Sequence, residues 1–145
     1  MMNVFSLNCR GLKDHRRLQT IVNNCIRKHS DLDNLCICLQ ETKISNVTNH
    51  HLKILEYYHL TYKFFPSDGQ SGGLMTIFPA NYVLLNTHKS SNTISLHFSQ
   101  HNVTLTNTYI RPTDYHLQQF LADVLVIEQF HCSTHIICGD FNALP

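Results

Sequence analysis

Short apolar runs of strand length alternate with helical patterns along this chain, and that alternation decides its fold class. Residues 4–7 form an apolar run that stops at Asn-Cys-Arg-Gly, and residues 35–39 form a longer one, as expected of strands. Between them apolar residues recur at offsets of three and four, which is the period of a helix. These residues are Leu18, Ile21, Val22, Cys25 and Ile26. The chain is therefore predicted to begin as strand, helix, strand.

The remaining pattern adds a short helix, a series of strands, a second long helix and a last strand. The short helix is predicted at 50–58. Strands are predicted at 62–65, 73–78, 83–85, 93–98, 103–109 and 135–138, with a turn at 66–69. Asp114 is expected to cap the long helix, whose apolar stripe is predicted to be core as part of residues 117–130. The stripe consists of Leu117, Phe120, Leu121, Val124 and Leu125. This order predicts one mixed α/β domain, with a sheet covered by helices.

Composition excludes a disordered or membrane-spanning chain. Of the 145 residues, 43% are hydrophobic and 14% are charged, which favours an ordered core. The net charge of +1 means that any attraction to nucleic acid must be local. No run approaches the roughly 20 apolar residues of a membrane span, and the opening residues do not form a secretory signal. We therefore expect an intracellular protein, nuclear or cytoplasmic and not secreted, that does not contact a membrane.

The six cysteines are predicted to be free and mostly buried thiols rather than disulfides. The chain contains no Cys-x-x-Cys pair, and Cys36-x-Cys38 alone does not make a zinc site.

Compact polar groups follow several of the predicted strands, which is where ligands bind in α/β sheets. They are Asn8, Gln40-Glu41, Asn107 with Tyr109, and Asp140 with Asn142. Each group alone is more often a turn or cap former, but four with the same placement point to a site. Their chemistry suits magnesium, because Glu41 offers a carboxylate and Asn8 a neutral oxygen. Cleavage of a phosphodiester also requires stabilised charge and an oriented water, which Asp140, Asn142 and Tyr109 can provide.

Five segments resemble, in this order, successive motifs of the endonuclease/exonuclease/phosphatase superfamily. They are residues 6–12 (Ser-Leu-Asn-Cys-Arg-Gly-Leu), 39–43 (Leu-Gln-Glu-Thr-Lys), 71–74 (Ser-Gly-Gly-Leu), 107–109 (Asn-Thr-Tyr) and 139–143 (Gly-Asp-Phe-Asn-Ala). The first two look most like the apurinic-type endonuclease of non-LTR (LINE-like) retrotransposons, whereas cellular apurinic/apyrimidinic endonucleases often have an acidic residue in place of Arg10.

This resemblance implies a DNase I-like, four-layered α/β sandwich and a Mg²⁺-dependent enzyme, with Mn²⁺ as a substitute, that acts on DNA. By the same resemblance, Asn8 and Glu41 belong to the metal site, and Tyr109 contacts the scissile phosphate. Asp140 positions or activates the nucleophile, and Asn142 stabilises the transition state. Asn107 is expected to support Tyr109 and Asp140 through hydrogen bonds.

The sequence departs from the family pattern in two places. Arg111-Pro112 follows Asn-Thr-Tyr where many relatives have a Pro-Asn pair. In addition, the late Asp-His pair of the family has no counterpart, because residues 1–145 match only about two thirds of a family domain. The expectation is one domain truncated before its carboxyl-terminal part, and we interpret His131 and His135 as structural.

Some features carry more than one interpretation. Six basic residues lie between positions 10 and 28, namely Arg10, Lys13, Arg16, Arg17, Arg27 and Lys28. They can contact phosphates, but the solvated face of a helix is favoured. Arg10, Lys43 and Arg111 are weaker candidates for DNA contacts. The pair Gly72-Gly73 suits either close approach of a substrate or a bend that enters a strand.

Three functions remain open at this point. The first is a Mg²⁺-dependent endonuclease that nicks DNA. The second is an inactive remnant or nucleic-acid-binding module, whose missing strands favour association with itself or with a partner that covers the gap. The third is a hydrolase of a phosphoinositide or sphingolipid headgroup, against which the first two motifs argue.

Overall fold

The computed structural model describes residues 2–29 and 31–142 and contains eight strands and three α-helices within them. In chain order the elements are β1 (Asn3–Asn8), α1 (His15–Lys28), β2 (Leu35–Gln40), α2 (Asn49–Tyr57), β3 (Leu60–Phe65), β4 (Leu74–Pro79), β5 (Leu84–Lys89), β6 (Thr93–Phe98), β7 (Val103–Tyr109), α3 (Asp114–Ile127) and β8 (Thr134–Asp140). Short 3₁₀ turns occupy Leu32–Asn34 and Gln100–Asn102.

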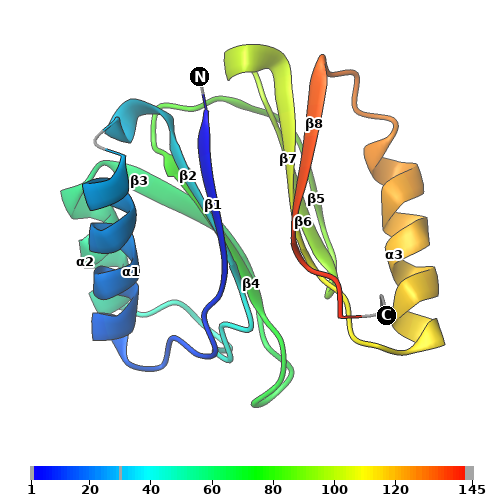
Figure 1. The fold of residues 1–145 in the computed structure, drawn as a ribbon, viewed down its shortest axis with the longest axis horizontal. Coiled ribbons are helices and arrows are strands. Elements are labelled where there is room, and N and C mark those ends of the chain that lie inside the picture. Colours follow the sequence, from blue (N-terminus) through cyan, green and yellow to red (C-terminus); the bar gives the residue numbers. More distant parts are fainter. Residues whose placement is uncertain (1, 30, 143–145) are drawn as a thin grey trace.

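The strands form two four-stranded sheets with the orders β1-β2-β4-β3 and β5-β6-β7-β8. Each sheet contains one parallel pair, β1 with β2 and β7 with β8, and its other neighbours are antiparallel. The sheets pack face to face, with α1 and α2 outside the first sheet and α3 outside the second (Figure 1). The four-layered α/β sandwich expected from the sequence is therefore confirmed for the part of the family fold that this chain spans.

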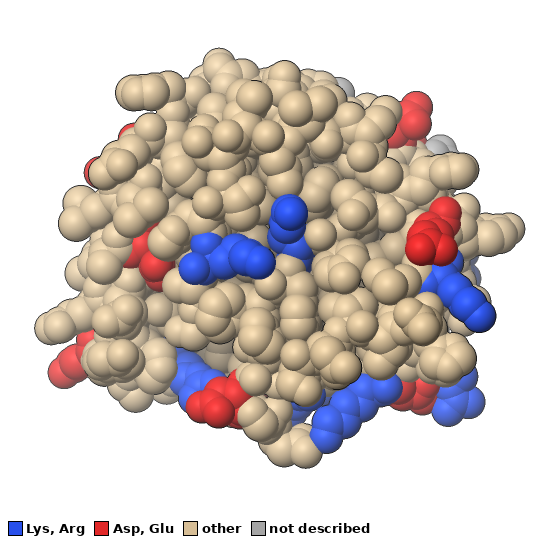
Figure 2. Space-filling view, turned by 180° about the vertical axis from the view of Figure 1, so that it is seen from behind, with Lys and Arg blue, Asp and Glu red and all other residues tan. Residues whose placement is uncertain are grey.

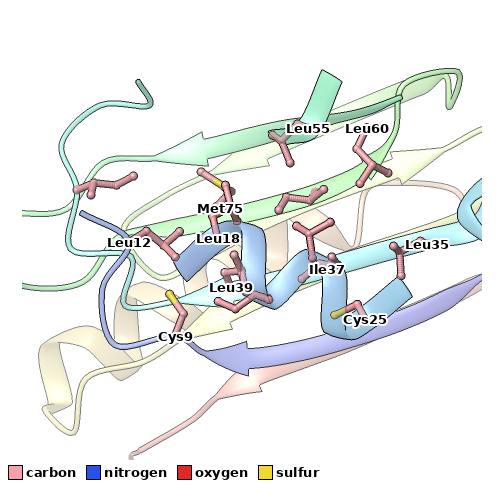
Figure 3. Packing of buried hydrophobic residues seen from close by; sticks show 14 residues of the cluster. Cys9, Leu12, Leu18, Cys25, Leu35, Ile37, Leu39, Leu55, Leu60 and Met75 are labelled. Carbon is pink, nitrogen blue, oxygen red and sulfur yellow. The ribbon is translucent and has the colours of Figure 1, made fainter. Parts of the chain in front are cut away.

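Helix α1 forms as its apolar period predicts. Its N-cap is Asp14, whose side chain accepts a hydrogen bond from the backbone N–H of Arg16 at 3.0 Å, which satisfies one of the free donors of the first turn. The predicted stripe is buried at Leu18, Ile21 and Val22. This stripe packs with residues of the first sheet in one core cluster, part of which Figure 3 shows from close by.

A second core lies between the two sheets and explains why several strands are buried on both faces. Strands β2, β4 and β6 are buried at every position, because each has a sheet neighbour on both sides and a layer on both faces. Phe78 and Phe98 meet there with their ring centroids 5.1 Å apart, and Tyr82 contacts Phe98 at the same distance.

The strand predicted at 83–85 differs from the observed one, which is β5 (Leu84–Lys89). Asn86 to Lys89 are polar, and β5 is an edge strand with mostly exposed or half-exposed side chains. An edge strand needs no apolar alternation, so its sequence pattern was too weak to show its full length.

Helix α3 corrects two expectations. Its N-cap is Thr113, whose hydroxyl accepts from the backbone N–H of His116 at 3.2 Å, so Asp114 is the first helical residue and not the cap. The predicted core stripe is largely outside: Leu117, Leu121 and Leu125 are 40%, 55% and 65% exposed. The interpretation of residues 117–130 as core is therefore wrong for these three leucines, whereas Ile127 is buried and Phe120 and Val124 are half-buried. Within the described part of the chain only the second sheet covers this helix, and the three leucines lie on its uncovered side.

A buried carboxylate holds α3 against the sheet. Asp123 is 7% exposed, and its two oxygens bind different residues of the β5–β6 hairpin. His88 Nε2 lies 2.8 Å from Oδ1, and the Ser90 hydroxyl donates to Oδ2 at 2.8 Å. Ser90 Oγ also accepts from the backbone N–H groups of Asn92 and Thr93. These three side chains tie the helix to the turn, and no sequence pattern pointed to them.

Asp123→Ala is expected to destabilise the fold by about 2 kcal/mol, because it leaves two partly buried polar partners without their acceptor. Asp114→Ala, at the exposed start of the same helix, is the matched control and is expected to cost at most about 0.5 kcal/mol. Urea unfolding followed by circular dichroism measures both. Equal losses for the two variants would contradict the role given to Asp123.

Gly139 is required by the close approach of β7 and β8. Its φ is +140°, and a Cβ atom built there would overlap the carbonyl oxygen of Thr108, its partner in the parallel ladder. Overlap with backbone cannot be relieved by a rotamer change, so the two strands would have to separate.

We expect Gly139→Ala to cost roughly 2–4 kcal/mol, from overpacking and backbone strain together. Gly69→Ala is the control, because Gly69 also has a positive φ of +60° but nothing lies within 4 Å of the added Cβ. That variant carries only the left-handed penalty of about 1 kcal/mol. Thermal denaturation of both proteins, measured in parallel, gives the difference.

Among the described residues, no helix is both long enough and apolar enough to cross a bilayer.

Candidate active site

The parallel pairs β1-β2 and β7-β8 bring the predicted site residues to one edge of the sandwich. Asn8 lies opposite Gln40 in the first pair, and Tyr109 lies opposite Asp140 in the second. Figure 1 shows β1 and β8 side by side, both running toward the lower end of the molecule. Carboxyl ends of parallel strands meet at the same edge, so four separate segments converge there.

The amide of Asn8 joins the two acidic residues of the site. Its nitrogen donates to the carboxylate of Glu41 and, at 3.0 Å, to Oδ2 of Asp140. Its oxygen accepts from the backbone N–H of Arg10 at 3.2 Å. Asn8 was expected to offer an oxygen to a metal ion. In this arrangement its nitrogen faces both carboxylates, so Asn8 holds them together and its oxygen is engaged elsewhere.

The backbone around Glu41 is held in a left-handed conformation by its neighbours. Glu41 and Lys43 have φ values of +55° and +56°, which non-glycine residues adopt only when the surroundings impose it. The loop is fixed by hydrogen bonds from Thr42 N to Gly73 O at 3.2 Å and from Lys43 N to Gly72 O at 2.9 Å. The position of the Glu41 carboxylate is therefore set by the fold.

The same contacts explain the pair Gly72-Gly73. Both residues have positive φ, and a Cβ at Gly73 would overlap the Thr42 hydroxyl oxygen. The pair enters β4 through a bend that packs on the loop of Glu41, which favours the structural interpretation of these glycines.

Tyr109 lies beside the two carboxylates. Burial raises the pKa of its phenol, and the negative charge of Glu41 raises it further, while the guanidinium of Arg111 acts in the opposite direction. Asp140 also raises this pKa, and the phenol hydrogen-bonds Glu41. Because the shift is upward from the ordinary value, the hydroxyl stays protonated and remains a hydrogen-bond donor at neutral pH.

Asn107 is buried below the site and makes different contacts from those expected. Its nitrogen donates to Leu39 O at 3.1 Å and Met75 O at 3.0 Å, and its oxygen accepts from Gln40 Nε2 at 2.8 Å. Asn107 therefore joins β7 to the first sheet, in place of the expected bonds to Tyr109 and Asp140. Gln40, which belongs to the same polar group as Glu41 in the sequence, has no predicted role of its own there, and the structure shows it to be the partner of Asn107.

The remaining candidates lie around the rim. Asn142 is exposed, with its backbone N–H 3.2 Å from Asp140 Oδ1, and Ala143, the last residue of that motif, lies outside the described residues.

Arg111 reaches Gly72, where its Nη2 is 3.2 Å from the position of an added Cβ. Lys43 lies near Gly11, and Arg10 is exposed. Charged side chains also gather along the lower rim in Figure 2.

The basic residues of α1 do not converge on the site. Arg16 pairs with Asp14 at 2.9 Å on the exposed surface and lowers the pKa of that carboxyl to about 2. The nearby Arg17 donates to the carbonyl of Cys9 at 2.7 Å. These contacts agree with a solvated helix face. His135 bonds the Thr106 hydroxyl at 2.8 Å, in line with its structural interpretation.

The donor set suits a hard cation with few protein ligands. Glu41 and Asp140 provide carboxylates, and among the described residues no group of three or more His, Cys, Asp or Glu side chains is placed to hold a metal ion. Magnesium commonly takes one or two carboxylates and completes its shell with water and phosphate oxygens. Two negative groups that share one amide donor also repel each other, which a divalent ion offsets. The residues present therefore fit Mg²⁺.

The fold and this site define a family. Residues 2–145 match the Endonuclease/Exonuclease/phosphatase family. The chain belongs to that family.

Solved structures share its fold at low sequence identity. The 3'-5' exonuclease NExo from Neisseria meningitidis superposes with a TM-score of 0.69 at 18% identity, over 96% of this chain and 57% of that one. A NExo structure bound to product DNA hairpin gives 0.73 at 17% identity, over 98% and 58%. An AP endonuclease from Archaeoglobus fulgidus gives 0.65 at 17%, over 97% and 57%. This chain therefore spans little more than half of these structures, less than the two thirds estimated from motifs.

No curated protein sequence is detectably similar to this chain.

Asn107→Ala is expected to destabilise the protein by roughly 2–4 kcal/mol, because Gln40 and two backbone carbonyls lose their partners in the buried interior. Asn142→Ala, at an exposed position of the same site, is expected to change stability by less than about 0.5 kcal/mol. Chemical unfolding of the two variants separates a structural asparagine from one that is free to face a substrate. A stable Asn107→Ala protein would contradict the buried network.

Proposed function

We propose that this chain carries the metal-binding part of a Mg²⁺-dependent endonuclease that nicks DNA, of the type found in LINE-like retrotransposons. The observation that carries the proposal is the contact of the Asn8 amide with both Glu41 and Asp140, beside the protonated phenol of Tyr109. The two carboxylates form a candidate cation site, and the phenol beside them can donate a hydrogen bond to a phosphate oxygen. With this role we propose a nuclear or cytoplasmic location for the protein.

Each residue then has a distinct task. Glu41 would hold the Mg²⁺ or Mn²⁺ ion, which when bound offsets phosphate charge and supplies Lewis acidity. Tyr109 donates its hydroxyl hydrogen to a phosphate oxygen. Asp140, fixed by Asn8, accepts a hydrogen bond from the attacking water and orients it in line with the leaving group. Asn142 is exposed two residues after Asp140 and can donate an amide hydrogen to a non-bridging oxygen.

Two arguments favour DNA as the substrate. The first motif, with Arg10 and Gly11, and the second, with Glu41 and Lys43, resemble those of retrotransposon endonucleases. Arg10 and Lys43 also follow Asn8 and Glu41 by two residues, and Arg111 follows Tyr109 by two, so that we expect them to contact the phosphates that flank the scissile one. The solved NExo structure with product DNA shows that this fold accommodates DNA in another protein.

A second candidate is a nucleic-acid-binding module or remnant without turnover. It rests on the share of the solved structures that this chain spans, 57% in two of them, and on the exposed stripe of α3, which would favour self-association or a covering partner.

The test is nicking of supercoiled plasmid by the purified chain with Mg²⁺ or EDTA. The proposal expects relaxed plasmid only with Mg²⁺, and a loss of about 100-fold or more in Asp140→Asn, since the group that orients the water is neutralised. Asp33→Asn, an exposed acid away from the site, is the control and should match the parent. Soluble phosphoinositide is the competing substrate, and its hydrolysis without plasmid nicking would favour a lipid-headgroup enzyme.

A thermal shift with Mg²⁺ separates the two candidates. Binding to the folded state stabilises it by RT ln(1 + L/Kd), where L is the free Mg²⁺ concentration, so the melting temperature rises with the logarithm of that concentration, and Glu41→Gln should remove the effect. A Glu41-dependent shift without nicking would support the non-catalytic module. Absence of both shift and nicking would overturn the proposed metal site.

A further inference from the structure

The loops that follow three strands of the first sheet come together beside the metal carboxylates. Strands β1 and β2 are parallel, and β3 runs in the same direction because β4 is antiparallel to both β2 and β3. The loops after β1, β2 and β3 therefore leave the sheet at the same end, which is the lower end in Figure 1. They are residues 9–14, 41–48 and 66–73. Glu41 is the first residue of the second loop, so a ligand held among these loops lies close to the metal site.

Residues of the three loops, together with His51 of α2, line a cavity of about 350 Å³. This volume is within the range of roughly 300–1,000 Å³ that is common for ligand pockets. The lining contains two lysines, Lys13 from the first loop and Lys43 from the second, and no Asp or Glu. Neither lysine forms an ion pair with a carboxylate in the described part of the chain. The charge of the cavity therefore favours an anionic ligand.

Hydrogen bonds between the loops fix the walls of this cavity. The backbone N–H of Leu12 donates to Thr42 O at 2.8 Å, and that of Ser67 donates to Ile44 O at 2.9 Å. Nε2 of the buried His51 lies 2.7 Å from Leu12 O. All three loops are thus joined to one another or to α2. A cavity that is already formed costs less conformational entropy to fill than one that flexible loops must assemble.

The other polar groups of the lining match a nucleobase. Asn46 and Gln70 line the cavity from two different loops, and both are exposed to solvent. Each amide offers a donor and an acceptor, which is the combination that Asn and Gln use to read the edge of a base. Ile44 adds an apolar wall. A base can enter such a cavity only when it is unpaired and unstacked, so lysines and amides together favour an unpaired nucleotide over a simple phosphate ion.

We propose that this cavity binds one unpaired nucleotide of the substrate strand, next to the phosphodiester that is cleaved at the metal site. Lys13 and Lys43 bind the phosphate of this nucleotide, and Asn46 and Gln70 form hydrogen bonds with the edge of its base. Lys43 follows Glu41 by two residues, so at most about 7 Å of backbone separates them. The inference rests on the proposed endonuclease activity, and it assigns to the cavity a preference for the base that flanks the cleavage position.

Fluorescence anisotropy of labelled single-stranded octamers in EDTA measures binding without cleavage. With oligomers of thymidine, deoxyadenosine and deoxycytidine, we expect the best to bind about fivefold or more tightly than the weakest. A duplex of the same length should bind less tightly than the best single strand. Lys13→Gln and Lys43→Gln should weaken binding of every octamer and lower the slope of log affinity against log salt by about 0.7 each. Asn46→Ala and Gln70→Ala should instead reduce the preference among bases.

Ser45 provides a matched pair of variants in the wall of the cavity. Ser45→Glu places a carboxylate beside the two lysines and should weaken binding of every octamer at least severalfold. Ser45→Gln has almost the same size without the charge and should bind more tightly than Ser45→Glu. Lys53→Gln, at an exposed position of α2 outside the cavity, should match the parent. Circular dichroism of each variant checks that it is folded.

Two results would overturn the nucleotide site. The first is binding by Lys13→Gln and Ser45→Glu that equals binding by Lys53→Gln. The second is competition by inorganic phosphate that is as strong as competition by a mononucleotide, which would leave only an anion site. Plasmid nicking with Mg²⁺ by the same proteins tests the endonuclease separately. Nicking by a chain whose variants bind octamers normally would remove the nucleotide site alone, whereas cavity-dependent binding without nicking would remove the endonuclease and keep the binding site.

Discussion

The buried amide of Asn107 is the interaction on which the sandwich depends. It reaches from β7 into the first sheet and bonds the backbone of both β2 and β4, while Gln40 bonds it in return. Apolar contacts between sheets tolerate sliding, whereas directional bonds to two strands allow only one alignment. That alignment places β8 beside β1 and so brings Asp140 to Asn8. The buried hydrogen bonds of Asn107 therefore fix the relative positions of Glu41 and Asp140.

Much of this arrangement could be predicted from sequence, because strong patterns report directly on burial. The apolar stripe of α1 predicts an amphipathic helix, and the apolar run of β2 predicts a buried strand. Polar residues that follow parallel strands lie at the same edge of the sheet. The ordered motifs then gave the family and its layers. Asn8, Glu41, Tyr109 and Asp140 were all named before the fold was known, and the structure brings them together.

What the sequence did not reveal depends on neighbours that no local pattern describes. The stripe of α3 has the same period as that of α1, but period alone does not say whether a second layer covers it. The orientation of the Asn8 amide follows from two carboxylates that are 33 and 132 residues away along the chain. Asp123 and Asn107 are polar residues in the interior, and their partners His88 and Gln40 lie 35 and 67 residues away along the chain.

The two helical layers bury different numbers of residues, and this difference determines which helix opens first in local unfolding. Helix α1 buries a stripe of four residues in the first core, while α3 buries only Asp123 and Ile127. Local opening follows the number of buried contacts an element must break. The amide hydrogens of α3 should therefore exchange with solvent through partial opening, well before those of α1 and β2. The second sheet would be left intact but uncovered, and mild heating would first expose its outer face, whose side chains are largely polar and include Ser95, Thr106 and His135.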